Sequence, residues 1–212
     1  IQVIKNLFNS LENIQELSDY IAANENVVYS KVIENCDSLL KCISDTINLD
    51  NAGEINILIF EKLEKSFFKR GLNQDFDRLE ENMHDEYDKL VAHKNYYNKL
   101  FDNPNPEFVK IENKKENKKD DIHLTITDAR SKKLKNILSS TNISGIVEVS
   151  YNSTYNNTPK ILKISTTNIE FGTSTGNNKF IKTLDIKNVV TKYLSFRQDM
   201  NARMQRYYNL FI

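Results

Sequence analysis

The residue types that most often perform chemistry are sparse here, and their spacing favours neither catalysis nor metal binding. His84 and His93 stand nine residues apart, which would put them on opposite sides of a helix, and His123 lies alone in a predicted strand. Asp75 and Asp77 fall at the predicted start of a helix, where acids complement the helix dipole rather than act as an acid–base pair. Because spacing groups no nucleophile with a base and an orienting acid, we expect no enzymatic activity, no metal and no cofactor.

The two cysteines indicate reduced thiols. Cys36 and Cys42 stand six residues apart in one predicted helix, about 1.7 turns, so they point to different faces and we expect no disulfide between them. The given residues contain no basic-then-apolar segment typical of a signal peptide, and the longest apolar runs, such as 57–60, are far shorter than the ~20 residues of a membrane span. We therefore expect an intracellular protein without a membrane partner, in a compartment that the sequence does not identify. Because Ile1 already lies in a helical pattern, we expect the chain to be a segment of something longer.

Basic residues provide the most specific chemistry in the sequence. Residues 108–182 carry thirteen Lys or Arg against seven Asp or Glu, a net charge of about +6, whereas the rest of the chain carries sixteen against twenty-two, about −6. Lysine suits phosphate as an adaptable point charge, so the basic clusters of this segment are candidates for contact with a nucleic-acid backbone. There are two such clusters: Lys114, Lys115, Lys118 and Lys119, and then Arg130, Lys132, Lys133 and Lys135.

For each cluster the alternative is a solvated surface whose charge only confers solubility. Acidic residues interleave the first, a pattern equally typical of a solvated loop, whereas a helix would hold the charges of the second in a row. The Asn-, Ser- and Thr-rich segments 152–158 and 172–178 would either add hydrogen bonds to phosphate or form ordinary hairpin turns. These alternatives stay open at the level of the sequence.

Apolar periodicity predicts helices on both sides of a strand-rich insert. Apolar residues recur at three and four over 1–21 and 28–47, which predicts two amphipathic helices, and turn-forming residues at 50–53 close the second. A third apolar segment covers 55–68. Its start at 55–60 could be a strand, but the charged run 61–65 favours a helix. Gly71 then breaks the pattern, Asn73 is placed to cap the next helix, and a stripe with a spacing near 3.5 runs from Phe76 to Phe101 before two prolines.

After the prolines the apolar period switches to two. Strands are predicted at 108–112, 122–127, 145–151, 161–165, 169–171 and 180–184, with a charged loop at 113–121 and a short helix at 129–138. A second helical stripe follows over 186–211 and matches the first in length. This order is typical of an antiparallel helix pair that carries a compact insert.

Two segments resemble the MutS family of DNA mismatch-repair proteins. The first resembles the turn and capped helix start that lead into the clamp-bearing helix of that family, and the second, from Ile122 to Leu134, resembles its central clamp strand and the basic helix that follows. Many members begin this strand with Gly-aromatic-aromatic, where this sequence has Asp121, Ile122 and His123. The order of segments also matches, so the resemblance covers essentially the whole chain. The matching residues of the first segment, a structural motif, are Gly71, Leu72, Asn73, Phe76, Asp77 and Leu79.

The resemblance implies an α+β, mainly α fold, with a helical lever body and a long antiparallel helix pair that carries a small antiparallel β clamp insert. The implied parts are lever helices at 1–107, which include an outgoing arm at 73–102, then the clamp at 108–184 and a returning lever helix at 185–212. In the family, the clamp grips the backbone of double-stranded DNA without reading its sequence, and the lever couples that grip to a distant ATPase domain. The resemblance also implies that the parent protein is a dimer.

Motifs for the other activities of that family are absent from the sequence. The mismatch-reading module carries Phe-x-Glu and the nucleotide site needs Gly-x-x-x-x-Gly-Lys-Ser/Thr, and neither occurs here. We therefore expect this segment neither to hydrolyse ATP nor to recognise a mispair by itself. The alternative is a protein–protein interaction module, in which the acidic, striped flanks form an intermolecular coiled coil and the β insert docks a partner.

Overall fold

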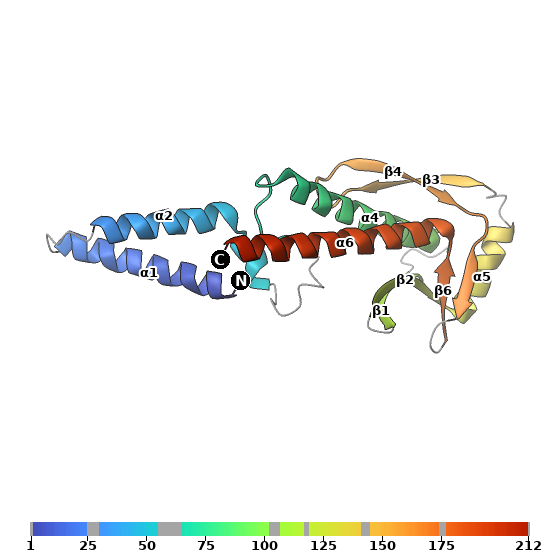
Figure 1. Cartoon of the computed structure of the whole chain (residues 1–212). Helices are drawn as coiled ribbons and strands as arrows, with labels where there is room; N and C mark the ends of the chain where they lie inside the picture. The colour runs from blue at the N-terminus through green and yellow to red at the C-terminus, as the bar shows by residue number, and fades with distance from the viewer. Residues whose placement is uncertain are drawn as a thin grey trace. The chain divides into compact units, whose positions relative to one another are not determined.

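The computed structural model describes residues 2–24, 30–54, 65–101, 107–116, 119–140, 145–173 and 177–211. The fold is mixed α+β and contains two small antiparallel sheets (Figure 1). It divides into two compact units, which we call unit 1 (Ile1–Glu80 with Arg197–Ile212) and unit 2 (Glu81–Phe196). The predicted boundaries at 107/108 and 184/185 separate a β insert from its helical flanks. This is a different division from that into two compact units, and it stays a prediction.

The helices follow the predicted periodicity closely. The segments predicted at 1–21, 28–47, 76–101, 129–138 and 186–211 are all confirmed as helices. Long amphipathic stripes without internal proline or glycine specify these elements well, because each turn repeats the same apolar contact. In chain order the helices are α1 (Gln2–Asn24), α2 (Ser30–Thr46), α3 (Leu49–Glu54), α4 (Gln74–Lys99), α5 (Asp128–Ser140) and α6 (Leu184–Phe211).

In the described part of the chain, six strands form two sheets, both in unit 2. The strands are β1 (Lys110–Glu116), β2 (Lys119–Thr127), β3 (Ile146–Asn152), β4 (Pro159–Ser165), β5 (Glu170–Thr173) and β6 (Asn178–Lys182). One sheet has the order β1-β2-β6-β5, and β3 and β4 form a separate hairpin (Figure 1). The predicted loop at 113–121 was wrong, because most of it belongs to β1 and β2, which pair from Lys110 with Thr125 to Glu116 with Lys119. Backbone hydrogen bonds hold this ladder, and a polar sequence does not prevent them.

Unit 1 packs α1, α2 and α3 together and receives the C-terminal part of α6. Leu11 of α1 and Ile43 of α2 are buried, and α6 contributes Met200 and Met204, both fully buried. Residues 50–53, predicted as a turn, lie instead in α3, so that prediction was wrong. The reason is a cap: the Asn48 side chain accepts the N–H of Asn51 at 3.0 Å and starts a short helix.

The segment 55–68 was predicted as a helix, and residues 55–64 lie outside the part of the chain that the structure describes. Its described end, 65–68, is not helical. Asn48 N donates to Phe67 O at 2.7 Å and Lys69 N donates to Thr46 O at 2.9 Å, which makes an isolated antiparallel bridge after α2. Pairing with another segment therefore replaced the local helical pattern here.

In unit 2, α4 and α6 lie side by side and run antiparallel (Figure 1). The rings of Tyr87 and Tyr193 meet at 5.5 Å between centroids, and the stripe residues Met83, Leu90 and Tyr97 are buried. The apolar stripe of α4 is thus covered within this single chain. The helix α5 packs on β2 and β6, and this packing positions the second of the two basic clusters that the sequence singled out.

Candidate nucleic-acid interface

The helix α5 is fixed to its sheet at two points. Leu134 is fully buried against the sheet, and the N–H of Asp128, the first residue of α5, donates to Asn177 O at 2.8 Å. Ser131 is buried as well, and its hydroxyl donates to Asp128 O at 2.7 Å. The inner side of α5 is therefore anchored on the sheet, and its outer side faces solvent.

The four basic residues of α5 are all exposed, but they do not form one row. Residues three apart share a helix face, so Arg130 lies beside Lys133 and Lys132 lies beside Lys135. At about 100° per residue, the two pairs lie roughly 160° apart around the helix, on either side of its solvent-facing arc. The expectation that α5 aligns its charges in a row was wrong, because the sequence spacing spreads them.

Two of these four side chains are engaged within unit 2. The guanidinium carbon of Arg130 lies 4.0 Å from the centre of the Phe108 ring, a cation–π contact. Lys132 Nζ lies 2.9 Å from Asp128 Oδ2, and Lys179 Nζ of β6 lies 3.8 Å from the other oxygen of that carboxylate. The hydrogen bond from Lys132 lowers the pKa of Asp128 below its ordinary value, with a smaller contribution from Lys179. Asp128 is therefore ionised near neutral pH and competes with any external anion.

Lys133 and Lys135 differ from their neighbours. Both are exposed, and among the residues that the structure describes neither has an acidic partner within 4.0 Å. An unpaired ammonium loses nothing internal when it meets a phosphate, so these two are the most available cations of α5. The sequence did not identify Phe108 as the partner of Arg130 or Asp128 as the partner of Lys132. Asp128 stands four residues before Lys132, which is the spacing of a helical ion pair.

The first basic cluster is only partly described. Lys118 lies outside the described residues, and Lys114, Lys115 and Lys119 are described only as backbone positions of β1 and β2. The register pairs residue 114 with 121, 115 with 120 and 116 with 119, which places the cluster at the turn end of the β1–β2 hairpin.

The β3–β4 connection uses its polar side chains internally. Thr154 donates to Asp88 Oδ2 from its backbone N–H at 2.7 Å and from its hydroxyl at 3.1 Å, and Asn156 Nδ2 donates to Glu81 Oε1 at 3.0 Å. Both carboxylates belong to α4. The turn interpretation of 152–158 is therefore the one that matches the structure, while residues 174–176 of the other segment lie outside the described part.

A third acid, Asp85, fastens the same hairpin to α4. Its carboxylate accepts hydrogen bonds from Tyr151 at 3.0 Å, Lys160 at 2.8 Å and Lys89 at 2.8 Å. Burial alone would raise the pKa of Asp85, but these hydrogen bonds, led by the one from Lys160, lower it below its ordinary value. Lys160 is paired with Asp85 and therefore does not add an available cation to a phosphate-binding surface.

The structural motif at 71–79 lies in unit 1. Gly71 has a φ of +90°, a backbone conformation that side chains disfavour, and its N–H donates to Asp77 Oδ2 at 2.8 Å. Asn73 caps α4 through its side-chain oxygen, which accepts from Asp75 N at 3.0 Å and Phe76 N at 3.2 Å. Leu79 is half-buried on the same helix.

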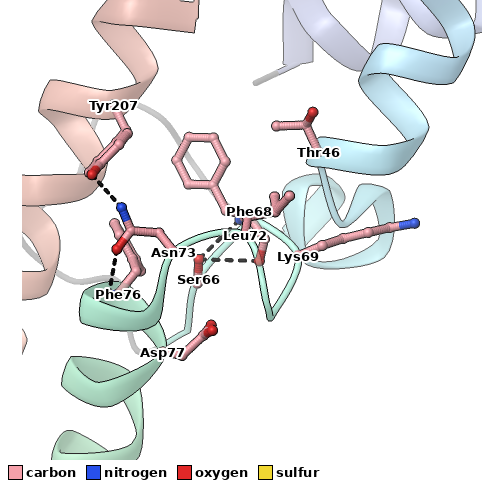
Figure 2. Close-up of a pocket in the computed structure, with 9 residues that line it drawn as sticks. All are labelled: Thr46, Ser66, Phe68, Lys69, Leu72, Asn73, Phe76, Asp77 and Tyr207. Atoms are coloured by element: carbon pink, nitrogen blue, oxygen red, sulfur yellow. Dashed lines mark hydrogen bonds between the residues drawn. The ribbon is translucent and has the colours of Figure 1, made fainter.

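This motif lines a cavity of about 290 Å³ within unit 1, shown in Figure 2. Phe68, Phe76 and Tyr207 meet edge to face with centroids 5.9 to 6.2 Å apart, and Asn73 Nδ2 donates to the Tyr207 hydroxyl. These three rings form part of the wall of the cavity, where the turn, α4 and α6 come together. The motif therefore has a structural explanation: it starts α4 and joins it to the last helix of the same unit.

Among the described residues, no group of three or more His, Cys, Asp or Glu side chains is close enough to hold a metal ion. Cys36 is buried and Cys42 is exposed, and both are free thiols. No helix in the described part of the chain is long and apolar enough to cross a membrane. No protein-family model and no curated protein sequence matches this chain.

Proposed function

We propose that this chain is the lever and clamp segment of a MutS-like DNA mismatch-repair protein, and that unit 2 grips double-stranded DNA by its phosphates. The observation that carries this proposal is α5, a helix anchored on a sheet with Lys133 and Lys135 exposed and unpaired among the described residues. An anchored helix already fixes the backbone that carries these cations, so no loop has to be ordered when they bind phosphate.

The expected grip does not read sequence. Reading base edges usually requires side chains that form paired hydrogen bonds, such as arginine on guanine or asparagine on adenine. The free cations of α5 are lysines, which act as point charges, and Arg130 is already stacked on Phe108. The net charge of about +6 over residues 108–182 supports the same conclusion, because it attracts a polyanion without selecting its sequence.

The lever part of the proposal depends on α4 and α6. Each of these helices contributes residues to both units, since the boundaries between units fall after Glu80 and after Phe196. Long helices transmit displacement because their backbone hydrogen bonds resist bending. In the proposed parent protein, a distant ATPase would act on the clamp through them, and this segment itself would perform no catalysis.

An equilibrium titration of a fluorescent duplex at several salt concentrations tests the grip. If about four phosphates are neutralised, log K should fall with log salt at a slope near −3.6. The double variant Lys133→Glu with Lys135→Glu should bind more weakly and flatten the slope by about 1.8, because two phosphate contacts are lost.

The matched control is Lys187→Glu with Lys192→Glu, which makes the same charge change at two exposed positions of α6 in unit 2. Affinity should change much less in this control. A salt-independent affinity, or equal losses in the two double variants, would refute the proposed surface.

The coiled-coil interaction module remains the second proposal. It requires the α4 stripe to meet a second chain, and its support is the acidic, periodic flanks of the sequence. Five stripe residues, Phe76, Met83, Leu90, Tyr97 and Phe101, are already buried within this chain. Light scattering during size-exclusion chromatography distinguishes the proposals, since a stable dimer that depends on residues 76–101 would favour the module.

A further inference from the structure

Arg130 differs from the other cations of α5 in the way its side chain is held. Its guanidinium carbon lies 4.0 Å from the centre of the Phe108 ring, and the residue as a whole is exposed. Among the described residues, no carboxylate lies within 4.0 Å of Arg130 and no oxygen accepts a hydrogen bond from its side chain. The ring therefore holds the guanidinium without neutralising its charge.

The contact with the ring leaves the hydrogen-bond donors of Arg130 available. A guanidinium carries five N–H groups in one plane, in a fork that matches two oxygens of a phosphate. An aromatic ring attracts the cation through its π electrons and has no oxygen that would accept those N–H groups. Phe108 is itself partly exposed, so the guanidinium can bind a phosphate from solvent while it keeps its contact with the ring.

Phe108 is fixed at the end of α4. Its N–H donates to Asn98 Oδ1 at 3.0 Å, and its ring meets the Phe101 ring edge to face at 5.1 Å between centroids. Asn98 and Phe101 are both buried, so the two anchors of Phe108 belong to the interior of unit 2. The guanidinium of Arg130 is therefore positioned by the end of α4 as well as by its own helix.

Lys133 supplies a second charge on the same side of α5. It stands three residues after Arg130, a spacing that puts two helical side chains next to each other, about 5 to 6 Å apart at their Cβ atoms. Lys132 and Lys135 lie on the other side of the solvent-facing arc, where Lys132 is paired with Asp128. Within the described part of the chain, the Arg130 side of α5 thus holds two adjacent cations that lack an acidic partner.

We propose that Arg130, positioned by Phe108, binds one phosphate of the duplex backbone through two N–H groups at once, with Lys133 beside it as a point charge. This inference rests on the proposed DNA grip and names the residue that orients it. A bidentate contact between arginine and phosphate adds geometric specificity to charge. A side chain that is held in advance also loses less rotamer freedom on binding, whereas the lysines of α5 offer charge alone.

Arg130→Lys keeps the charge and removes the fork. In the duplex titration, affinity should fall about fivefold because a charge-assisted hydrogen bond is lost, while the salt slope should stay near −3.6. Arg130→Gln should also flatten the slope by about 0.9, because it removes the charge. The matched control is Arg206→Lys, at an exposed arginine of α6 in unit 1, and it should leave the affinity unchanged.

Phe108→Leu tests the positioning role of the ring. It should weaken binding about threefold at unchanged slope, and Phe108→Tyr, which keeps a ring, should retain wild-type affinity. Because the ring acts through the arginine, Phe108→Leu should have no further effect in the Arg130→Gln background. A ring that only stabilised the fold would weaken binding equally in both backgrounds, and urea denaturation of each variant measures that contribution separately.

Two duplexes distinguish a phosphate contact from a base contact. The loss in Arg130→Lys should be the same with a duplex of A·T pairs only and with one of G·C pairs only, since both present the same phosphates. A loss confined to the G·C duplex would assign Arg130 to a guanine edge and overturn the inference.

The inference and the proposed function fail in different ways. An effect of Arg130→Lys below about twofold, or equal effects of Phe108→Leu in the two backgrounds, would overturn the inference and leave the grip by Lys133 and Lys135 standing. If the wild-type chain shows no salt-dependent affinity for either duplex, the proposed function fails and the inference with it. The expected result is a loss at constant slope in Arg130→Lys that is equal on both duplexes.

Discussion

Replacing Asn98 with alanine should destabilise the chain more than any other single polar change on α4. Asn98 is buried near the end of this helix, and its side chain holds the two residues that precede β1. Its oxygen accepts the N–H of Phe108 at 3.0 Å and of Val109 at 2.8 Å, and its amide donates to Val109 O at 3.1 Å. Asn98→Ala removes all three bonds at once.

The magnitude follows from what the substitution leaves behind. Each bond contributes about 1 kcal/mol net, and a buried polar group without a partner costs about 1 to 3 kcal/mol. Val109 is almost fully buried and cannot replace its lost partners with water, whereas Phe108 is partly exposed and can. Alanine recovers about 0.5 kcal/mol of helix propensity. We expect a net loss of about 3 kcal/mol in the free energy of unfolding.

Urea denaturation followed by circular dichroism measures this loss as a shift of the midpoint at unchanged slope. Asn95→Ala is the matched control, because Asn95 is exposed one turn earlier on the same helix and should be neutral or slightly stabilising when replaced. If the two variants differ by less than about 1 kcal/mol, Asn98 does not hold the β1 segment and the reasoning fails. Asn98→Asp, which keeps the two acceptor contacts but buries a charge, should also be destabilised.

Two further predictions concern one residue in each unit. Burial lowers the pKa of His93 from 6.5 to about 4, with a smaller opposing effect from Asp185. Between pH 6.5 and 4, His93 is therefore protonated in the unfolded chain but not in the folded one. The free energy of unfolding should fall by about 3 kcal/mol as the pH drops from above 6.5 towards 4. In His93→Leu this pH-dependent loss should be absent, so the stabilities of the two proteins, measured by urea denaturation, should change differently as the pH falls below 6.5. Parallel pH profiles of the two proteins would contradict the prediction. Asn73→Ala should cost about 1 kcal/mol through loss of the α4 cap, measured against Asn73→Ser, which retains an acceptor.

The helices could be predicted because their signal is local and repeated. A stripe such as that of α4 presents an apolar side chain at every turn, so each turn independently supports the same assignment. Burial of Met83, Leu90 and Tyr97 shows that the stripe identified the core face as well. Strands β2 to β6 were predicted for the same reason, with a period of two.

The errors share a different cause, which is pairing between segments far apart or polar. The strand character of 113–116 depends on its partner β2, because its own residues have no apolar alternation. Residues 65–68 leave the helical pattern because the backbone after α2 pairs with Phe67 and Phe68. The role of Asn98 was equally invisible, since an asparagine next to the last residue of a helix usually faces water.

The candidate site shows the same limit for charge. The sequence counts cations, but folding decides which of them are free to meet an external anion. Lys160 is held by Asp85 and Lys132 by Asp128, so a phosphate that engages either must break a hydrogen bond of 2.8 or 2.9 Å. A phosphate that engages Lys133 or Lys135 breaks none among the described residues. A lysine already paired with an internal carboxylate must give up that contact to bind a phosphate, which offsets the gain. If unit 2 grips DNA as proposed, its affinity should therefore follow the number of unpaired cations rather than the net charge of about +6.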